Sequence, residues 1–334
     1  MPERGVTVAI PVRDGGELLA GTLRALSRQS VEHELLICDS GSRDGSVETA
    51  RAYGARVLEI DPGKFNHGAT RNLLVGEARG AHVALLTQDA EPADEHWLAR
   101  LLGSFDLAPD VGIAYGPYRP RPGASAAVRL ELERWFRSLS PDGELELERL
   151  AEGERGLALS GLLGRRGFFS DANACVARKA WERVPFREVA YAEDRVLAVD
   201  MLRAGYAKAF VPDAAVLHSH DYSPLGQLRR SFDEGRGLRE VYGWREPASP
   251  LRVALGLRGE LGATHRELLA AGVAPAQRRA TLAAVAVHQL PRTAGALLGS
   301  RAECLPPWAR RRLSLERRAG FAPVNFDAPA GGGQ

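Results

Sequence analysis

A chain of 334 residues that is 45% hydrophobic has ample apolar material for a large globular core, and its length suits one α/β domain with an appendage. No uncharged apolar run reaches the ~18–20 residues that span a bilayer, and the N-terminus lacks the apolar stretch of a signal peptide. We therefore expect a cytoplasmic protein, neither secreted nor integral to a membrane.

Apolar, β-branched runs alternate with helical patterns through the first half of the chain. Strands are predicted at 6–10, 35–38, 56–60 and 82–87, and helices between them at 17–28, 45–53 and 67–78. Such repetition predicts a mostly parallel sheet with helices on both faces, which is an α/β fold. In this fold the ligand crevice lies beyond the carboxyl ends of the strands, so the residues at each strand end deserve inspection.

The first two strands end in turns that carry polar residues. Pro11 and Arg13 follow the first strand, and Asp39 and Ser40 follow the second. A carboxylate at this place can accept hydrogen bonds from a base N–H and a ribose hydroxyl, which makes these four residues candidates for nucleotide binding. The alternative is that Asp39 only forms the turn.

The ends of the next two strands carry more residues that could bind a ligand. The run Gly63–Asn72 places Lys64, Phe65, Asn66, His67 and Arg71 near a helix start, which favours binding of phosphate oxygens. The fourth strand ends in Gln88-Asp89-Ala90, where a carboxylate followed by proline is suited to hold Mg²⁺ or Mn²⁺ beside a diphosphate. A capping role before a helix at 94–107 is the alternative.

Two acidic and histidine clusters lie further along the chain. Glu193 and Asp194 open a predicted helix, where dipole stabilisation alone would also favour them. His218 and His220 close an apolar run at 214–218 and lie on the same side of an extended strand, which favours metal ligation. Another apolar run, at 172–177, is predicted to be a strand.

The order of these motifs resembles the inverting glycosyltransferases of family 2, which have a Rossmann-like GT-A fold. The branch that it resembles most is the bacterial rhamnosyltransferases, through the run Phe65–Asn72 and the Gln88-Asp89-Ala90 variant of the Asp-x-Asp motif. The resemblance covers at least residues 5–240. It implies a nucleotide-sugar donor, a divalent cation, and a glycan or lipid-linked acceptor.

The resemblance also implies roles for individual residues. Asp39 would recognise a pyrimidine base, Arg71 the diphosphate and Asp89 the metal, with Gln88 near the ribose. Asp194 would be the general base, with Glu193 next in line. His218 would supply a second metal ligand, with His220 as its substitute, and the segment containing Asp171 and Asn173 would line the donor and acceptor pocket.

The expected reaction is direct displacement at the anomeric carbon, with dTDP-rhamnose as the first donor candidate and a UDP-sugar (galactosyl or glucosyl) as the second. A sugar nucleotidyltransferase would need a lysine in the loop after the first strand, and Pro11–Glu17 has none. A catalytically dead glycan-binding module would be expected to lack Asp89 or Asp194. Both residues are present.

The C-terminal third has a different character. We expect a transferase domain at 1–222, helices at 223–327 and a disordered tail at 328–334. From residue 223 onward 17 arginines face 9 acidic residues, and the run Leu305–Leu313 places Trp308 beside three arginines. This pattern predicts peripheral contact with the inner face of a membrane, or else a homodimer contact. No nucleic-acid partner is expected.

Overall fold

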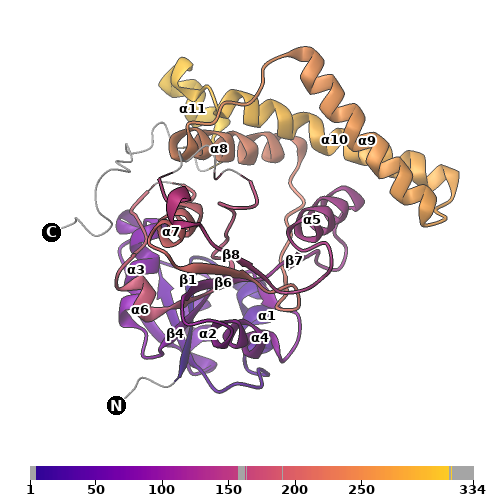
Figure 1. Ribbon diagram of the computed structural model, residues 1–334. Coiled ribbons are helices and arrows are strands. Elements are labelled where there is room, and N and C mark those ends of the chain that lie inside the picture. The colour runs from indigo at the N-terminus through magenta and orange to yellow at the C-terminus, as the bar shows by residue number, and fades with distance from the viewer. Residues whose placement is uncertain (1–4, 157–161, 163, 190, 316, 318–334) are drawn as a thin grey trace. The chain divides into compact units, whose positions relative to one another are not determined.

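The computed structural model describes residues 5–156, 162, 164–189, 191–315 and 317 (Figure 1). These residues divide into two compact units. The first covers 5–121 and 135–218, and the second covers 122–134 and 219–315.

A mixed sheet of eight strands forms the first unit, in the order β3-β2-β1-β4-β9-β6-β10-β8. Its strands are β1 (Val6–Val12), β2 (Glu34–Asp39), β3 (Arg56–Glu59), β4 (His82–Leu86), β6 (Val111–Tyr115), β8 (Glu146–Glu148), β9 (Asn173–Ala177) and β10 (Ala207–Phe210). The first four are parallel, as the sequence predicts, and β10 is parallel to β6. β9 runs antiparallel between β4 and β6, and β8 is antiparallel to β10. The predicted α/β class is confirmed.

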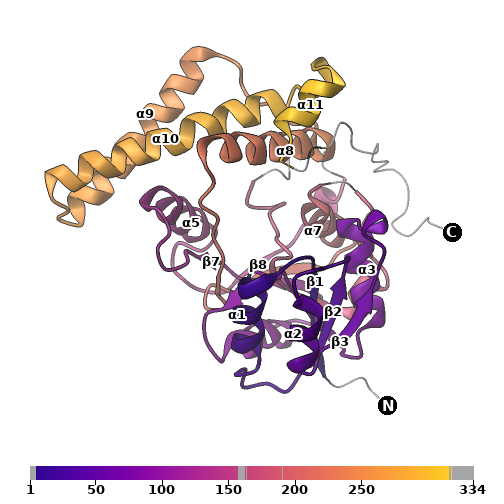
Figure 2. The same cartoon turned by 180° about the vertical axis from the view of Figure 1, so that it is seen from behind.

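Helices cover both faces of this sheet. The helices are α1 (Gly16–Leu26), α2 (Ser46–Ala52), α3 (His67–Glu77), α4 (Trp97–Gly103), α6 (Arg178–Trp181) and α7 (Glu193–Arg203). Right-handed crossovers put α1 and α2 on one face and α3 on the other, as Figures 1 and 2 show. Alternate residues of β1, from Val6 to Val12, pack with Leu19 and Leu23 of α1 in the core.

Several elements differ from the prediction. β6 and β10 were not predicted, because Gly112 and the buried Lys208 interrupt their apolar runs. The predicted helix at 94–107 is shorter: it begins at Trp97, and after Gly103 the 3₁₀ turn η2 (Ser104–Asp106) replaces its end. The reason is that 91–92 form a strand and Asp94 then accepts a hydrogen bond from the His96 N–H at 2.9 Å in a turn. The predicted strand at 214–218 is only β11 (Val216–Leu217).

The second unit is helical. It contains α8 (Pro224–Tyr242), α9 (Pro250–Ala270), α10 (Pro275–Gly299) and α11 (Pro307–Leu313), with the first part of α5 (Ala126–Leu139). α8 and α10 cross closely because of glycine: a Cβ on Gly295 would lie 2.2 Å from the Leu228 carbonyl oxygen, and one on Gly299 2.1 Å from that of Phe232. Among the described residues, no helix is both long and apolar enough to cross a membrane.

The division between the units does not follow the predicted boundary at residue 222. It falls at 218, and residues 122–134 belong with the later helices. Ion pairs within the second unit account for this, since Arg134 contacts Glu267 at 2.9 Å and Glu131 contacts His288 at 2.6 Å. The predicted tail at 328–334, like the residues just before it, lies outside the described part of the chain.

Candidate active site

A small second sheet brings three distant parts of the first unit together. Its strands are β5 (Glu91–Pro92), β11 and β7 (Tyr118–Arg119), in the order β5-β11-β7. Val216 pairs with both Pro92 and Tyr118. Asp89 lies two positions before β5, and His218 directly follows β11. The pairing of β5 with β11 therefore places both residues at one edge of the small sheet.

Asp89 and His218 face each other directly. The His218 Nδ1 lies 3.5 Å from the Asp89 Oδ1, and their side chains are 14% and 15% exposed. A carboxylate and an imidazole at this separation and burial form a donor pair that fits a divalent cation. Their convergence is what the sequence interpretation required. His220 belongs to the second unit.

Asp194 lies in the first turn of α7, beside two further carboxylates. Ala192, with φ of 60°, turns the chain into this helix. Burial, followed by the nearby charges of Asp171 and Glu193, raises the pKa of Asp194 well above the ordinary carboxyl value. A carboxyl group whose pKa is moved toward neutrality is suited to accept a proton from a hydroxyl group near neutral pH.

Two site residues, Tyr118 and Arg121, were not predicted. The Tyr118 ring lies 4.9 Å from the His218 ring, and its hydroxyl hydrogen-bonds with that of Ser170. Burial raises the pKa of Tyr118, as do the charges of Asp194 and Asp171, so its hydroxyl stays protonated. The Arg121 guanidinium donates to the Asp89 carbonyl and lies 3.9 Å from a Glu91 oxygen. The Pro/Gly/Arg-rich character of residues 116–123 was the only signal for either.

The Phe65–Asn72 run has a structural part that the sequence did not reveal. Asn66 caps α3 through the Ala69 N–H and donates to the Val189 carbonyl. A Cβ on Gly68 would lie 2.1 Å from the Arg187 carbonyl oxygen, so only glycine fits there. The Asn72 carboxamide contacts Trp181 and the backbone of Phe186. These contacts hold the segment before α7, and through it Asp194.

Arg71 is buried beneath this site and was predicted to bind a diphosphate. Its side chain is 3% exposed, its Nε lies 2.8 Å from the Asp171 Oδ2, and one N–H donates to the Leu86 carbonyl. The structure therefore places Arg71 as a support for Asp171 and for the end of β4, away from the surface. Asp171 is likewise buried, between Arg71 and Asp194.

The outer side of the same run is formed by other residues. Lys64 is exposed at the end of the 3₁₀ turn η1 (Pro62–Lys64). Phe65 and His67 are partly buried, with ring centroids 4.9 Å apart, and the His67 Nδ1 lies 3.7 Å from a Glu193 oxygen. Lys64 and His67 are therefore the members of the run that remain candidates for contact with phosphate, and Phe65 remains a candidate for contact with the nucleotide.

The loops after β1 and β4 are joined by Gln88. The Arg13 N–H donates to the Gln88 Oε1 at 2.8 Å, and the Gln88 Nε2 donates to the Arg13 carbonyl at 3.1 Å. A carboxamide both accepts and donates, whereas an ionised carboxylate only accepts, so this pair of bonds favours a glutamine where the Asp-x-Asp motif has an acid. Gln88 thus joins two loops, whereas the sequence interpretation placed it at the ribose.

Asp39 and Ser40 shape the turn after β2. The Asp39 carboxylate accepts hydrogen bonds from the N–H groups of Gly41 and Ser42 and from the Ser42 hydroxyl. Ser40 donates to the Val12 carbonyl, next to Pro11 and Arg13 at the end of β1. The turn-forming alternative is therefore observed. Because each carboxylate oxygen has two lone pairs, this turn leaves base recognition by Asp39 a prediction.

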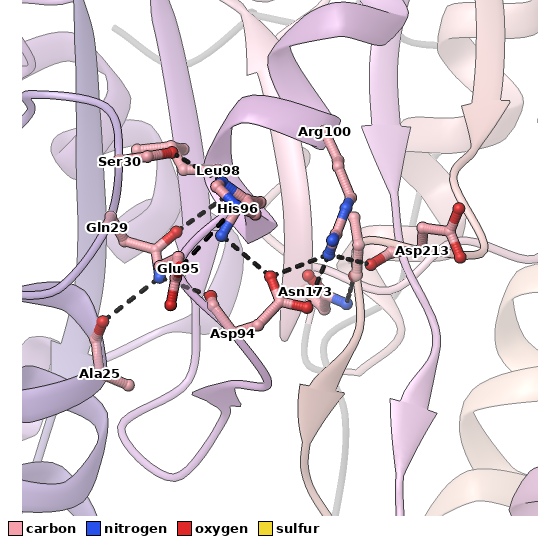
Figure 3. A network of polar contacts seen from close by, with 11 residues as sticks. Ala25, Gln29, Ser30, Asp94, Glu95, His96, Leu98, Arg100, Asn173 and Asp213 are labelled. Atoms are coloured by element: carbon pink, nitrogen blue, oxygen red, sulfur yellow. Dashed lines mark hydrogen bonds and ion pairs between the residues drawn. The ribbon is translucent and has the colours of Figure 1, made fainter.

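Asn173 lies in the core rather than at the surface. Its Oδ1 accepts from Trp97 at 2.8 Å, and its Nδ2 donates to the carbonyls of Pro117 and Ala214. Figure 3 shows Asn173 near Arg100, which contacts Asp94 and the Asp213 carbonyl. Asn173 thus has a structural role, because both of its amide hydrogens and its oxygen are bonded inside the fold, and its role in the pocket stays a prediction.

Comparison with known proteins places this geometry in a family. The model of the family described as "Glycosyl transferase family 2" matches residues 7–169. The O-antigen chain rhamnosyltransferase RfbN of Salmonella typhimurium is 31% identical over 236 residues, which is 69% of this chain and 71% of that protein. The chain belongs to glycosyltransferase family 2. The O-antigen chain rhamnosyltransferase WbaN of Salmonella anatum is also 31% identical, over 60% of this chain and 61% of its own length.

A solved structure agrees with the glycosyltransferase fold. The mannosyltransferase PcManGT from Pyrobaculum calidifontis, in complex with GDP-Man and Mn2+, superposes with a TM-score of 0.56 at 19% identity, covering 90% of this chain and 87% of that one. The predicted GT-A fold and the enzyme class are therefore confirmed. In this family 2 glycosyltransferase, Asp89 and His218 lie next to strand ends, where the sequence placed the crevice, and Asp194 lies in the first turn of α7.

Proposed function

We propose that this enzyme transfers L-rhamnose from dTDP-rhamnose to a hydroxyl group of a glycan or lipid-linked acceptor, with inversion at the anomeric carbon. Two relatives named O-antigen chain rhamnosyltransferases, each 31% identical, support the choice of sugar. The observation that carries the chemistry is the position of the buried Asp194 beside Asp171 and Glu193, close to Tyr118 and so to His218, and this environment raises its pKa.

The side chains of this site have separate roles in the reaction. Asp194 accepts the proton of the acceptor hydroxyl while that oxygen attacks the anomeric carbon. Asp171 maintains the high proton affinity of Asp194, and Arg71 holds Asp171 in place. Lys64 and His67, which flank the start of α3, contact the departing diphosphate.

Asp89 and His218 are the residues proposed to hold a divalent cation. Their facing donor atoms, 3.5 Å apart, and the Arg121 hydrogen bond to the Asp89 backbone support this assignment. A bound cation would neutralise charge that develops on the leaving diphosphate. With a single carboxylate at this position, the donor's phosphates should complete much of its shell.

The decisive experiment measures release of dTDP and UDP from a panel of nucleotide sugars, with and without acceptor glycan and with Mg²⁺ or Mn²⁺. Acceptor-dependent release from dTDP-rhamnose is the expected result. Release from a UDP-sugar alone would replace the proposed donor by the UDP-sugar alternative. Absence of release from every donor would reject the transferase activity of this chain.

We also propose that α11 contacts an anionic membrane surface. Trp308 is 67% exposed, and Arg311 and Arg312 beside it are exposed as well. Co-sedimentation with anionic vesicles that weakens at high salt is expected, because each basic residue near such a surface contributes about 1 kcal/mol. Equal failure to bind anionic and neutral vesicles would leave a homodimer contact as the alternative, which the oligomeric state in solution would show.

A further inference from the structure

A cavity of about 290 Å³ lies within the second unit, between α9, α10 and the segment that joins α8 to α9. Figure 1 shows α9 and α10 side by side, in orange and yellow-orange. Its walls combine apolar residues (Val253, Leu257, Leu297) with polar ones (Arg252, Gln289, Thr293). This volume is near the lower end of the range for small-molecule sites, about 300–1,000 Å³.

Three of the polar side chains on this wall are not used by the fold. Within the described part of the chain, no hydrogen bond or ion pair engages the side chain of Arg252, Gln289 or Thr293. Other polar residues of the wall are engaged: Arg292 pairs with Glu131 at 3.2 Å, and Glu260 pairs with Arg134. Three uncommitted polar groups that line one cavity can therefore serve a ligand.

The charges of the cavity indicate what kind of ligand fits. Arg252 and Arg292 contribute two positive charges, and Glu246 and Glu260 contribute two negative ones, so the lining is neutral overall. Burial of Arg292 lowers its pKa, but the charges of the nearby carboxylates, Glu131 first, outweigh this and raise the pKa, so the guanidinium stays positively charged beside them. A phosphate or nucleotide would instead require an excess of positive charge.

We propose that this cavity binds an uncharged sugar unit of the acceptor glycan, away from the carboxylate cluster that performs transfer. Sugar hydroxyls both donate and accept, which matches an amide, a hydroxyl and a guanidinium beside carboxylates. The apolar side chains can pack against the C–H face of a sugar ring. The inference rests on the proposed transfer to a glycan, and it adds a second binding site for that acceptor.

Two glycines of α9 provide a matched pair of variants. Gly256 lines the cavity and Gly259 does not, and a Cβ on either would meet nothing within 4 Å. Leucine at each position should therefore be tolerated, and it should slightly favour the helix. Gly256→Leu fills the cavity, whereas Gly259→Leu changes only the helix surface.

The test titrates the full-length protein, without donor, with uncharged oligosaccharides containing rhamnose, mannose or galactose, followed by calorimetry and ligand-observed NMR. Gly256→Leu should weaken binding of the best oligosaccharide about tenfold or more, as should Gln289→Ala combined with Thr293→Val. Gly259→Leu should bind like the wild type. Donor affinity, measured with dTDP, should be unchanged in all of them.

Several outcomes would overturn the inference about the cavity, and one would reject the proposed donor instead. Equal losses in both glycine variants would indicate a general effect on α9, and no loss in either would place the glycan elsewhere. Binding that disappears at high salt would indicate an anion site at the arginines. Wild-type protein that binds none of the oligosaccharides yet releases dTDP from dTDP-rhamnose would reject the cavity alone. Glycan binding without use of dTDP-rhamnose would reject the proposed donor alone.

Discussion

Two polar regions of the first unit look alike in the sequence but have different roles in the structure. The α3 motif (Phe65–Asn72) directs most of its polar side chains inward, to backbone groups and to Asp171. The carboxylate cluster (Asp171, Glu193 and Asp194) gathers like charges near Tyr118, whose ring contacts His218, the partner of Asp89. A high density of polar residues therefore marks support and chemistry equally, and only the direction of the side chains separates them.

The largest expected effect is the loss of Asp194. Asp194→Asn removes the proposed base while keeping the shape of the side chain, so kcat should fall by about 10²–10⁴-fold with little change in donor KM. Steady-state kinetics over a range of pH checks this. The wild-type profile should have an acidic limb above the ordinary carboxyl pKa. A variant with more than about a tenth of wild-type kcat would make Asp194 a helix cap, with Glu193 the next candidate.

Removal of either proposed cation ligand should be the next largest effect. Asp89→Ala and His218→Ala should each raise the Mg²⁺ or Mn²⁺ concentration needed for half-maximal activity by about tenfold or more, because few protein atoms hold the cation. Thermal unfolding provides the control, since neither variant should lose much stability. If His218→Ala saturates at the wild-type cation concentration, His218 is not a ligand and His220 should be tested.

Substitution in the α3 motif should lower stability and leave donor binding nearly unchanged. Asn72→Ala leaves the Trp181 indole N–H and both backbone groups of Phe186 without their partner, so the protein should be destabilised by about 2 kcal/mol. Denaturant unfolding measures this loss. Donor affinity of the remaining folded enzyme should stay near that of the wild type. A stable variant with weakened donor binding would make Asn72 a ligand-binding residue.

Substitution of Gln88 tests whether an acid at this position would bind the cation more tightly. Gln88→Glu keeps the size but removes the donor to the Arg13 carbonyl, so we expect a loss of about 1 kcal/mol in unfolding free energy and no gain in cation affinity. Calorimetric titration of Mg²⁺ or Mn²⁺ into both proteins gives the comparison. Tighter cation binding by the variant would show that this position faces the metal.

The smallest expected effect is the contribution of Asp194 to the pH dependence of the free energy of unfolding. Because the pKa of Asp194 is raised by folding, the folded state holds a proton that the unfolded chain releases. This contribution is fully present below the unfolded carboxyl pKa of about 3.9 and is lost as pH rises through the folded pKa. Asp194→Asn should therefore gain stability over the wild type as pH rises. Parallel melting curves from acid to neutral pH would contradict the raised pKa.

The sequence by itself determined the α/β class, the strands from β1 to β4 and the positions of Asp89, Asp194 and His218 at element ends. These are local properties: apolar periodicity defines the elements, and parallel strands bring their carboxyl ends to one edge. The helices of the C-terminal third were predictable for the same reason, since the spacing of apolar residues sets which face of each helix is buried.

Only the tertiary structure decided which polar residues are free to act. Whether Arg71, Asn173 or Gln88 meets a ligand depends on partners that lie 15 to 100 positions away in the chain, and no local pattern specifies them. The short strands β5 and β7 were equally hidden, because two residues carry no periodicity, and β11 was predicted only as part of a longer strand at 214–218. Their pairing is what places Asp89, Tyr118 and His218 together, since nonlocal backbone hydrogen bonds are fixed by the packed fold and not by neighbouring residues.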